Sequence, residues 1–411
     1  MKDWYDLIVV GGGPAGMMAA GRAGARGKKV ILLEKKDQLG KKLLICASGR
    51  CNVTNTASLE IFIEEYGKGG SFLRAALQRF DNEKLCSFLL SYGIETVVEN
   101  KGRVFPKSQR ADSVLMALKT YMHGHEVQIQ TNSEVLELKV ESNRVSGVET
   151  NHGNIFGKNI VIATGGCSYP ATGSTGDGYR LASSVGHTIY PTYPAIIAFE
   201  TEETWVKPLQ GTPLKNVNIT AYQSGKKIAE QFGEALFTHY GVSGPAILDM
   251  SKRIVECLHQ GYVQIRIDLK PKHTPEELES ILLDQIKRHG SKAMKSCLTF
   301  FIPEKLTPIF VNLCNIEPQK KASQITTPER KRIVKLLKGL SLTSVRHRPI
   351  EEAIVTAGGI SLDEVDAKTM QSKLWKGLYF AGEVLDIDGP TGGFNLQAAF
   401  STGYLTGDSV D

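Results

Sequence analysis

The stretch LIVVGGGPAG, residues 7–16, joins an apolar run to a glycine-rich turn, and a helical pattern follows at 17–26. A second apolar run at 30–33 ends at Glu34, and this order predicts a βαβ unit. The glycines match the fingerprint G-x-G-x-x-G, which is informative only when a strand precedes it and a helix follows. Both conditions hold. Glu34 stands 21 positions after the second glycine of the fingerprint, where an acid bonds ribose hydroxyls.

Each position of the glycine turn has an expected task. Gly11 allows the tight turn, Gly13 lets the backbone approach a pyrophosphate, and Gly16 permits close packing of the helix on the strand. Pro14 and Ala15 occupy the first helical positions, where free N–H groups and the helix dipole favour phosphate. We therefore expect a dinucleotide at this turn.

Size and composition fit a globular protein of two or three domains, since the chain has 411 residues, 41% of them hydrophobic. The net charge of +6 arises from 49 basic and 43 acidic residues; this mild excess permits anionic ligands without requiring a nucleic-acid partner. Seven cysteines without a dense spacing pattern fit free thiols in a reducing compartment. No signal peptide or apolar run of membrane-spanning length is recognisable, so we expect a cytoplasmic location.

The sequence predicts an α/β fold that is interrupted by an insert. After about residue 190 the sequence pattern changes to short strand-like runs and then to Lys-rich helical periodicity. A strand and a final helix are again predicted near the end of the chain. We expect a Rossmann-type domain formed by both chain ends and an inserted mixed β and α-helical domain. The expected bounds are 1–190 and 346–411 for the Rossmann-type domain, and 191–345 for the insert, β-rich at 191–270 and helical at 271–345.

Two segments beyond the second strand indicate a long ligand. GKKLL at 40–44 and SGRCNVTN at 48–55 form a further glycine-containing region that suits an extended dinucleotide. Arg50 and Asn52 are candidate catalytic residues, because their polar groups suit contact with a flavin ring or an anionic substrate. The alternative is a surface loop held by a structural arginine.

These two segments resemble the HI0933/YhiN-like flavoprotein family, also called BaiN-like or aminoacetone-oxidase-like. Further segments match across nearly the whole chain: GRVFP at 102–106, TGGCSYPATGSTGDG at 164–178, LFTHYGVSGP at 236–245, GEVLD at 382–386 and TGGFN at 391–395. The resemblance implies one FAD, a Rossmann-like domain built from both chain ends, and an inserted domain. It also implies a FAD-dependent oxidoreductase of undefined substrate.

Carried over residue by residue, the resemblance implies a set of FAD contacts. The glycine turn would hold the pyrophosphate, Glu34 the ribose, Val135 the adenine and Glu383 the ribityl chain, while Lys41 and Lys42 would flank the nucleotide. The cofactor-binding residues expected in all are Gly11, Gly13, Pro14, Ala15, Gly16, Glu34, Lys35, Lys41, Lys42, Arg50, Cys51, Val135, Thr164, Gly165, Gly166, Asp177, Gly382, Glu383, Gly393, Phe394, Asn395 and Leu396.

The end of the chain supports this assignment on physical grounds. Gly392 and Gly393 stand just before the final helical pattern, so free N–H groups would point at one place. A reduced flavin carries negative charge over N1 and O2, which a helix N-terminus would stabilise. Phe394, Asn395 and Leu396 would then approach the pyrimidine edge of the flavin. An ordinary glycine turn before a helix is the alternative.

One cysteine, Cys46, departs from the family pattern, whereas Cys51 belongs to it. Family members usually carry Gly or small polar residues where this chain has Cys46-Ala47-Ser48, and Cys46 with Cys51 forms a C-x-x-x-x-C spacing similar to the redox pair of flavin disulfide reductases. The chain shows no second nucleotide fingerprint and no C-terminal His–Glu partner, both of which that class carries. We therefore interpret Cys46 as a chance cysteine and expect Cys46→Ser to leave turnover largely intact.

Histidines and basic runs each have a functional and a structural interpretation. His239 is a candidate catalytic residue, because its pKa range suits proton transfer, with a packed structural histidine as the alternative. His123 and His125 have no further ligands nearby in the sequence, so no metal site is expected. The basic run 330–332 is interpreted as a solvated helix face.

The sequence leaves several functions open. The leading hypothesis is a FAD-dependent oxidoreductase that transfers a hydride to or from flavin N5 on a small-molecule substrate. NAD(P)H would dock only transiently, since the chain has one dinucleotide fingerprint; oxygen is the other electron partner. An NAD(P)H-dependent enone reductase, an amine oxidase, a FAD-dependent tRNA-modifying enzyme and a flavin-binding scaffold without turnover remain as alternatives.

Overall fold

A computed structural model describes residues 4–411, which divide into two compact units. The first unit combines the chain up to Pro194 with Ile350–Asp411, and the second is Ala195–Pro349. The expected limits of the insert were 191 and 345, four residues earlier at each side. None of the described helices has both the length and the apolar character needed to cross a membrane.

A parallel sheet forms the centre of the first unit. β1 (Trp4–Val10) lies between β2 (Val30–Leu33) and β9 (Gly153–Ile162), with β6 (Gln128–Gln130) beyond β2 and β18 (Leu378–Phe380) paired to β9. All five strands are parallel, so their carboxyl ends meet at one edge of the sheet. In open α/β sheets this edge is where ligands bind.

The sheet continues in an antiparallel meander and is accompanied by smaller sheets. β7 (Val135–Glu141) and β8 (Arg144–Thr150) form the expected hairpin, and β8 pairs with β9. The remaining elements of this unit are α2 (Lys41–Ile45), β3 (Thr54–Asn55), α3 (Leu59–Glu65), α4 (Gly70–Arg79), α5 (Asn82–Ser91), β4 (Thr96–Val98), β5 (Arg103–Pro106), α7 (Asp177–Ser184), β10 (Ile189–Pro194) and β17 (Thr356–Ile360).

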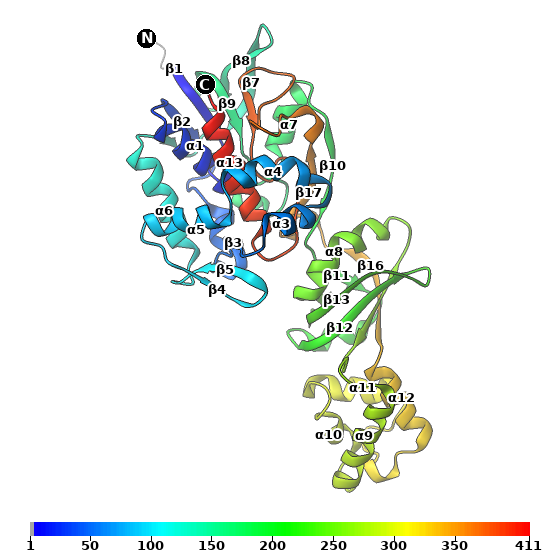
Figure 1. Ribbon diagram of the computed structural model, residues 1–411. Helices are drawn as coiled ribbons and strands as arrows, with labels where there is room; N and C mark the ends of the chain where they lie inside the picture. Colours follow the sequence, from blue (N-terminus) through cyan, green and yellow to red (C-terminus); the bar gives the residue numbers. More distant parts are fainter. Residues whose placement is uncertain (1–3) are drawn as a thin grey trace. The chain divides into compact units, whose positions relative to one another are not determined.

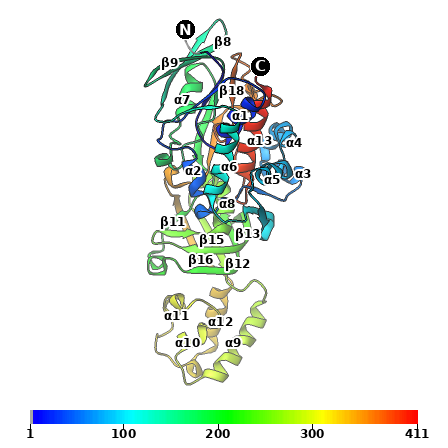
Figure 2. The same cartoon turned by 90° about the vertical axis from the view of Figure 1, so that its left-hand side faces the viewer.

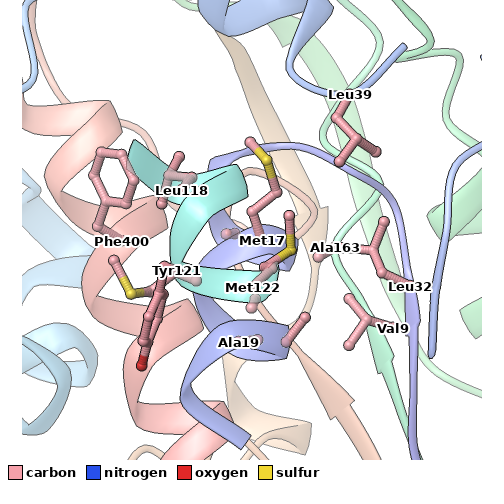
Figure 3. Packing of buried hydrophobic residues seen from close by; sticks show 14 of the residues in the cluster. Val9, Met17, Ala19, Leu32, Leu39, Leu118, Tyr121, Met122, Ala163 and Phe400 are labelled. Atoms are coloured by element: carbon pink, nitrogen blue, oxygen red, sulfur yellow. The ribbon is translucent and has the colours of Figure 1, made fainter. Parts of the chain in front are cut away.

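Three helices cover one face of the parallel sheet. α1 (Pro14–Ala25) packs between α6 (Ala111–Gly124) and α13 (Phe394–Ser409), as both views show (Figures 1 and 2). Their apolar side chains meet those of the strands in one buried cluster (Figure 3). The labelled members are Met17 and Ala19 of α1, Leu118, Tyr121 and Met122 of α6, Phe400 of α13, and Val9, Leu32, Leu39 and Ala163.

Glycines allow the last helix of the chain to pack directly on the first. A Cβ atom at Gly403 would stand 2.3 Å from the Ala15 carbonyl oxygen, and one at Gly407 would stand 2.4 Å from that of Ala19. The two helices therefore run parallel, with backbone against backbone. The Arg22 Nε donates to Asp408 at 2.9 Å and ties the same pair of helices together.

The second unit contains a closed barrel and a group of helices. The barrel order is β11 (Phe199–Thr201), β14 (Gly241–Ser243), β13 (Lys226–Phe237), β12 (Pro213–Gln223), β15 (Val263–Asp268) and β16 (Leu340–His347). The helices of this unit are α8 (Pro245–Leu258), α9 (Pro275–His289), α10 (Met294–Leu298), α11 (Thr307–Leu313) and α12 (Thr327–Leu337).

One expectation about the second unit was wrong. Residues 271–345 were expected to be helical, but β16 begins at Leu340 and pairs with both β15 and β11. Its first residues, LSLTS, alternate between buried positions and exposed or half-buried ones. This period of two is the pattern of a strand, and a partner more than 70 residues earlier completes its hydrogen bonds.

Candidate functional site: the carboxyl edge of the parallel sheet

The glycine turn leaves the start of α1 open. Gly11 has φ +108, and a Cβ there would stand 2.5 Å from the Ala163 carbonyl oxygen, so no other residue fits. A Cβ at Gly16 would stand 2.0 Å from the Gly11 oxygen. Gly13, the N-cap of α1, differs: a Cβ there would meet nothing within 4 Å, and no side chain caps the helix. The first N–H groups of α1, from Ala15 onward since Pro14 has none, therefore have no side-chain partner.

Glu34 is held at the carboxyl end of β2. One carboxylate oxygen accepts the Gly12 N–H at 2.8 Å and the other accepts the Lys36 N–H at 2.8 Å. These bonds fix the carboxylate beside the glycine turn, where the ribose contact was predicted. Lys35 bonds Asp177 and Thr175, so two of the expected contacts, Lys35 and Asp177, form an ion pair.

A partly buried polar network joins the residues that follow β9 and β18. The Lys42 ammonium donates to Glu383 at 2.7 Å and to the Ser168 hydroxyl at 2.6 Å. Glu383 also accepts the Thr356 N–H at 2.8 Å. Glu383 follows β18, and Ser168 follows β9. Lys41, in contrast, points to Asp37, which it pairs at 2.6 Å.

The residues after β9 contain an unused buried hydroxyl. Thr164, Gly165 and Gly166 extend from the end of β9, and Gly165 has φ +73. The Thr164 Oγ1 is buried without a hydrogen-bond partner among the described residues. Gly382, with φ +78, stands close to α1, since a Cβ there would lie 2.8 Å from that of Ala15. A buried hydroxyl without a partner has a free bond for a ligand.

A second open helix start is found at α13. Gly393 is its N-cap with φ +102, no side chain caps the helix, and a Cβ there would stand 2.2 Å from the Thr54 oxygen. The Asn395 side chain donates to the Gly389 oxygen at 2.8 Å, so it holds the preceding loop while its N–H stays at the helix start. Tyr66 donates to the Phe394 oxygen at 2.6 Å, and burial raises the pKa of Tyr66 well above its usual value, which keeps it a donor.

The starts of α1 and α13 lie at different points along the common axis of the two parallel helices. Gly403 packs on Ala15, so α13 begins nine residues before this contact whereas α1 begins beside it. At 1.5 Å per residue this displaces the start of α13 by roughly 13 Å along the shared direction. Leu396, in the first turn of α13, is partly buried against the same core as α1. A ligand that meets both starts must be long and must offer acceptor atoms at both places.

The loop before β3 contains both catalytic candidates of this unit. The Arg50 Nε donates to Gln109 at 2.6 Å, its guanidinium also bonds Glu99, and it lies 4.2 Å from the centroid of the Phe105 ring. These contacts give Arg50 a structural task. Asn52 is 8% exposed, and its Oδ1 has no partner among the described residues. Asn52 therefore keeps a free acceptor for a ligand. The Nε donor of Arg50, in contrast, is already used by Gln109.

Val135 lies near this edge, since the Ser133 N–H donates to the Glu34 carbonyl oxygen at 2.9 Å, whereas His239 belongs to the second unit. Val135 begins β7 and is buried, and its carbonyl oxygen accepts from Arg180 at 3.2 Å. His239 belongs to the second unit, where it is exposed in the turn between β13 and β14 and its ring lies 4.8 Å from that of Tyr240. The structure thus does not gather His239 with the residues of the sheet edge within one unit.

Three participants were not predicted from the sequence. Ser168 lies inside the quoted segment 164–178 and had a local signal, since it follows the Gly-Gly pair directly after a strand. Thr356 and Tyr66 stand in segments without a motif, and only the fold brings them to Glu383 and to α13. No group of three or more His, Cys, Asp or Glu suited to a metal ion occurs among residues 4–411.

The residues at the sheet edge fit FAD. The open space at Gly13 suits a pyrophosphate, the two uncapped helix starts offer donors to two parts of a long molecule, and the free atoms Thr164 Oγ1 and Asn52 Oδ1 need partners. The placement of each cofactor contact on these residues stays a prediction.

Comparisons with known proteins show a family for the chain. A family model described as the HI0933-like protein Rossmann domain matches residues 5–409. The chain is 30% identical over 403 residues to the 3-dehydro-bile acid delta(4,6)-reductase of Clostridium scindens, covering 97% of each protein. It is 31% identical over 417 residues to the ribosomal RNA dihydrouridine synthase of Haemophilus influenzae, covering 100% of this chain and 99% of the relative.

Solved structures resemble the chain in fold. The 3-ketosteroid delta1-dehydrogenase of Sterolibacterium denitrificans has a TM-score of 0.56 at 14% identity, covering 100% of this chain and 99% of that one. The open conformation of a flavocytochrome c3 fumarate reductase has a TM-score of 0.54 at 17% identity, covering 99% and 78%. Together with the family match, these likenesses confirm the α/β Rossmann-type fold class.

Proposed function

Since the chain belongs to the HI0933-like Rossmann-domain family, a family of FAD-dependent oxidoreductases, we propose that it reduces a carbon–carbon double bond conjugated to a carbonyl group. One observation carries the proposal. Two relatives that match almost the whole chain are named for the same kind of bond change, one as a delta(4,6)-reductase of a 3-dehydro-bile acid and the other as a dihydrouridine synthase.

The shared chemistry is that of a polarised alkene. In a 3-oxo-4,6-diene and in a uracil ring, a carbonyl withdraws electrons from the double bond, so hydride adds to the far carbon and a proton to the near one. FAD supplies hydride chemistry when it is bound. The chain would contribute the two open helix starts, which hold the dinucleotide, and α13 would favour the electron-rich reduced form.

The source of electrons is proposed to be NAD(P)H. The described residues contain one glycine fingerprint of the Rossmann type, and the fit to FAD occupies it. A nicotinamide dinucleotide would therefore dock only for the transfer and then leave, so that the substrate can follow.

We favour a uridine in RNA as the substrate over a free small enone, because the two units differ in charge. Of the 49 basic and 43 acidic residues in the chain, 23 and 15 lie in residues 195–349, which leaves 26 and 28 in the rest. The second unit thus carries the whole positive excess, and 14 of its basic residues but only 7 acidic ones lie at 269–339. A basic region of this kind is the electrostatic footprint of a phosphate backbone.

The reaction class is tested by following the flavin under anaerobic conditions. We expect NADH or NADPH to bleach the bound flavin, and a uridine-containing ribosomal RNA transcript or a 3-oxo-4-ene steroid to restore its colour. Mass spectrometry of the product would show two added hydrogens. Bleaching by a primary amine, with no reoxidation by either conjugated substrate, would show an amine oxidase and refute the proposal.

The substrate class is tested by charge reversal on α12. Lys331 and Lys335 are exposed, stand one turn apart and make no ion pair with any residue the structure describes. We expect the Lys331→Glu/Lys335→Glu double variant to weaken RNA binding and to reduce the salt dependence by about 2 phosphate contacts. Lys68→Glu/Arg74→Glu, an equal charge change on exposed residues of the first unit, is the control. Equal RNA affinity of both variants, with steroid reduction intact, would favour the small enone.

A further inference from the structure

The loop after α2 brings two cysteines together. Cys46 ends α2, and the chain then turns through the left-handed residues Ala47 and Ser48, with φ 49 and 57. Cys51 is also left-handed, with φ 62, and its N–H donates to the Cys46 oxygen at 3.1 Å. Left-handed conformations are unfavourable for residues with a side chain, and they concentrate at functional sites. Here they close a six-residue loop that sets one cysteine beside the other.

The two thiols are in contact and have unequal access. Their side chains are hydrogen-bonded to each other. Cys46 is half-buried, whereas Cys51 is 0% exposed. The Asn52 N–H donates to Cys46, and the positive charge of Lys42, one helical turn earlier, acts on it as well. Cys46 therefore has the surroundings of a thiolate, and Cys51 those of a thiol that donates to it.

The acidity of the thiols follows this arrangement. The hydrogen bond from Cys51 has the largest influence and lowers the pKa of Cys46, although burial opposes it. The same bond and burial raise the pKa of Cys51 well above its usual value. Burial raises the pKa of Cys86, Cys167 and Cys297 too. The pKa of Cys46 is lowered, in contrast to those of these three cysteines.

From the closed loop, the contact between the sulfurs and their unequal exposure, we propose that Cys46 and Cys51 form a thiol–disulfide exchange site for low-molecular-weight disulfides. The Cys46 thiolate attacks one sulfur of the small disulfide, forms a mixed disulfide and releases one thiol. The Cys51 sulfur then attacks Cys46 Sγ, closes the protein disulfide and releases the second thiol. One small disulfide is reduced to two thiols, and the two cysteines lose two hydrogens; the reverse reaction restores them.

The position of the pair connects it to the sheet edge. Two residues after Asn52, Thr54 donates to Gln397 of α13 at 2.6 Å, and Asn55 donates to the Gly392 oxygen at 3.0 Å. Lys42 donates to Glu383. A conformational change in the loop between Lys42 and Thr54 would therefore reach both Glu383 and the start of α13. The exchange reaction itself needs no bound flavin and is independent of the proposed reduction.

The exchange is tested on the full-length, flavin-loaded protein in buffers with increasing ratios of glutathione disulfide to glutathione. After quenching, the protein is denatured and its free thiols are alkylated, and mass spectrometry counts the alkyl groups. We expect the seven free thiols to fall to five, with the bond mapped to the peptide that contains Cys46 and Cys51, and reduced glutathione to restore seven. All seven thiols remaining free at every ratio would overturn the proposal.

Single variants test the order of attack. Cys51→Ser keeps a donor beside Cys46 but removes the resolving sulfur, so we expect it to accumulate one mixed disulfide with glutathione at Cys46. Cys46→Ser leaves only the fully buried Cys51, so no adduct is expected there. Cys86→Ser, at another half-buried cysteine, should still close the disulfide.

Alkylation rates in the unchanged protein test the same roles without any variant. In the unchanged protein at neutral pH, iodoacetamide should modify Cys46 at least tenfold faster than Cys86, as peptide mapping would show, because the thiolate is the reactive form. Equal rates for the two cysteines, or an adduct that forms on Cys51 when Cys46 is replaced, would refute the assigned roles.

Discussion

Two helices of the second unit and two of the first start in different ways. In the second unit, α9 begins at Thr274 and α12 at Thr326, and each start is closed by a capping box with Glu277 or Glu329. In the first unit, α1 and α13 begin at glycines and no side chain caps them. The first N–H groups of a helix need partners in both cases. The capping boxes supply these partners at α9 and α12, whereas a bound dinucleotide would supply them at α1 and α13.

The contrast is not a general property of the first unit. α3 begins at Ser58 and α5 at Asp81, and both of these side chains accept a hydrogen bond from the first turn. Other helices, such as α6 and α8, also lack a side-chain cap, but α1 and α13 are the two that pack on each other beside the parallel sheet. The difference therefore concerns the site, and substitutions at the two kinds of start should separate ligand binding from stability.

The largest effect is expected at the open start of α1. Gly13→Val places a side chain in space that is empty in the protein, and its φ of −80 suits valine, so the fold should survive. We expect FAD affinity to fall at least a hundredfold, or about 2.8 kcal/mol, because the side chain occupies the place of the pyrophosphate. Fluorescence titration of the apoprotein with FAD would measure this. Gly124→Val, at another glycine without neighbours, is the control, and unchanged FAD affinity in Gly13→Val would contradict the site.

The next effect is expected at the closed start of α12. Glu329 is 8% exposed and accepts from the Thr326 N–H at 2.7 Å and from Lys320 at 2.8 Å. Burial raises the pKa of Glu329, but these hydrogen bonds outweigh it and lower the pKa to about 2. We expect Glu329→Gln to cost about 2 kcal/mol of local stability, measured by hydrogen exchange of α12.

The pH dependence of this effect has a definite sign. The stabilisation by Glu329 is present above its unfolded pKa of 4.5 and is lost as the pH falls toward about 2. Glu317→Gln, at an exposed carboxylate, is the matched control. An equal loss in both variants, or a loss of FAD affinity in Glu329→Gln alone, would break the proposed separation between the two kinds of helix start.

A smaller effect is expected at Thr274. Its hydroxyl accepts the Glu277 N–H at 3.2 Å, and Thr274→Ala removes this cap at the start of α9. We expect a loss of about 1 kcal/mol, seen as faster hydrogen exchange in α9, and no change in FAD affinity. Ser58→Ala removes the corresponding cap of α3 in the first unit. If either substitution weakened FAD binding as much as Gly13→Val does, capped starts would not be purely structural.

The smallest effect is expected from His187 in the first unit. Its ring contacts Glu364 at 3.0 Å and Ser372 at 2.8 Å, and burial lowers the pKa of His187 although Glu364 opposes this. The folded state therefore favours the neutral ring, and stability present above the unfolded pKa of 6.5 is lost as the pH falls below it. Urea denaturation at pH 7 and 5.5 should show a decline that is reduced in His187→Gln. The exposed His123→Gln should decline like the unchanged protein.

Much of the first unit was predictable because its signals are local. The βαβ order, the glycine turn and the hairpin at 135–150 depend on residues that are neighbours in the chain, and the structure contains all of them. β16 was missed because its partners, β15 and β11, are distant in sequence. The pattern LSLTS is short, and the Lys-rich helices before it favoured a helical interpretation.

The residues of the candidate site also fall into two groups, those predictable from local sequence and those whose contacts depend on the fold. The glycines at 11, 13 and 16 and the acid Glu34 follow from spacing alone, since a tight turn into a helix requires them in that order. The sequence by itself also determined that Glu383 directly follows a glycine and that Asn52 stands three residues after Gly49. Only the tertiary structure decided that Arg50 is engaged by Glu99 and Gln109, and that Asn52 keeps a free acceptor.

The sequence alone thus determined the dinucleotide turn, because its geometry is a property of consecutive backbone dihedral angles. The convergence of the two chain ends was decided by packing: Gly403 and Gly407 let α13 lie against the backbone of α1, and this contact places the second open helix start. The contact between Cys46 and Cys51 likewise depends on how the loop folds back. Contacts of this kind depend on which surfaces fit together in three dimensions, and a linear pattern does not encode that fit locally.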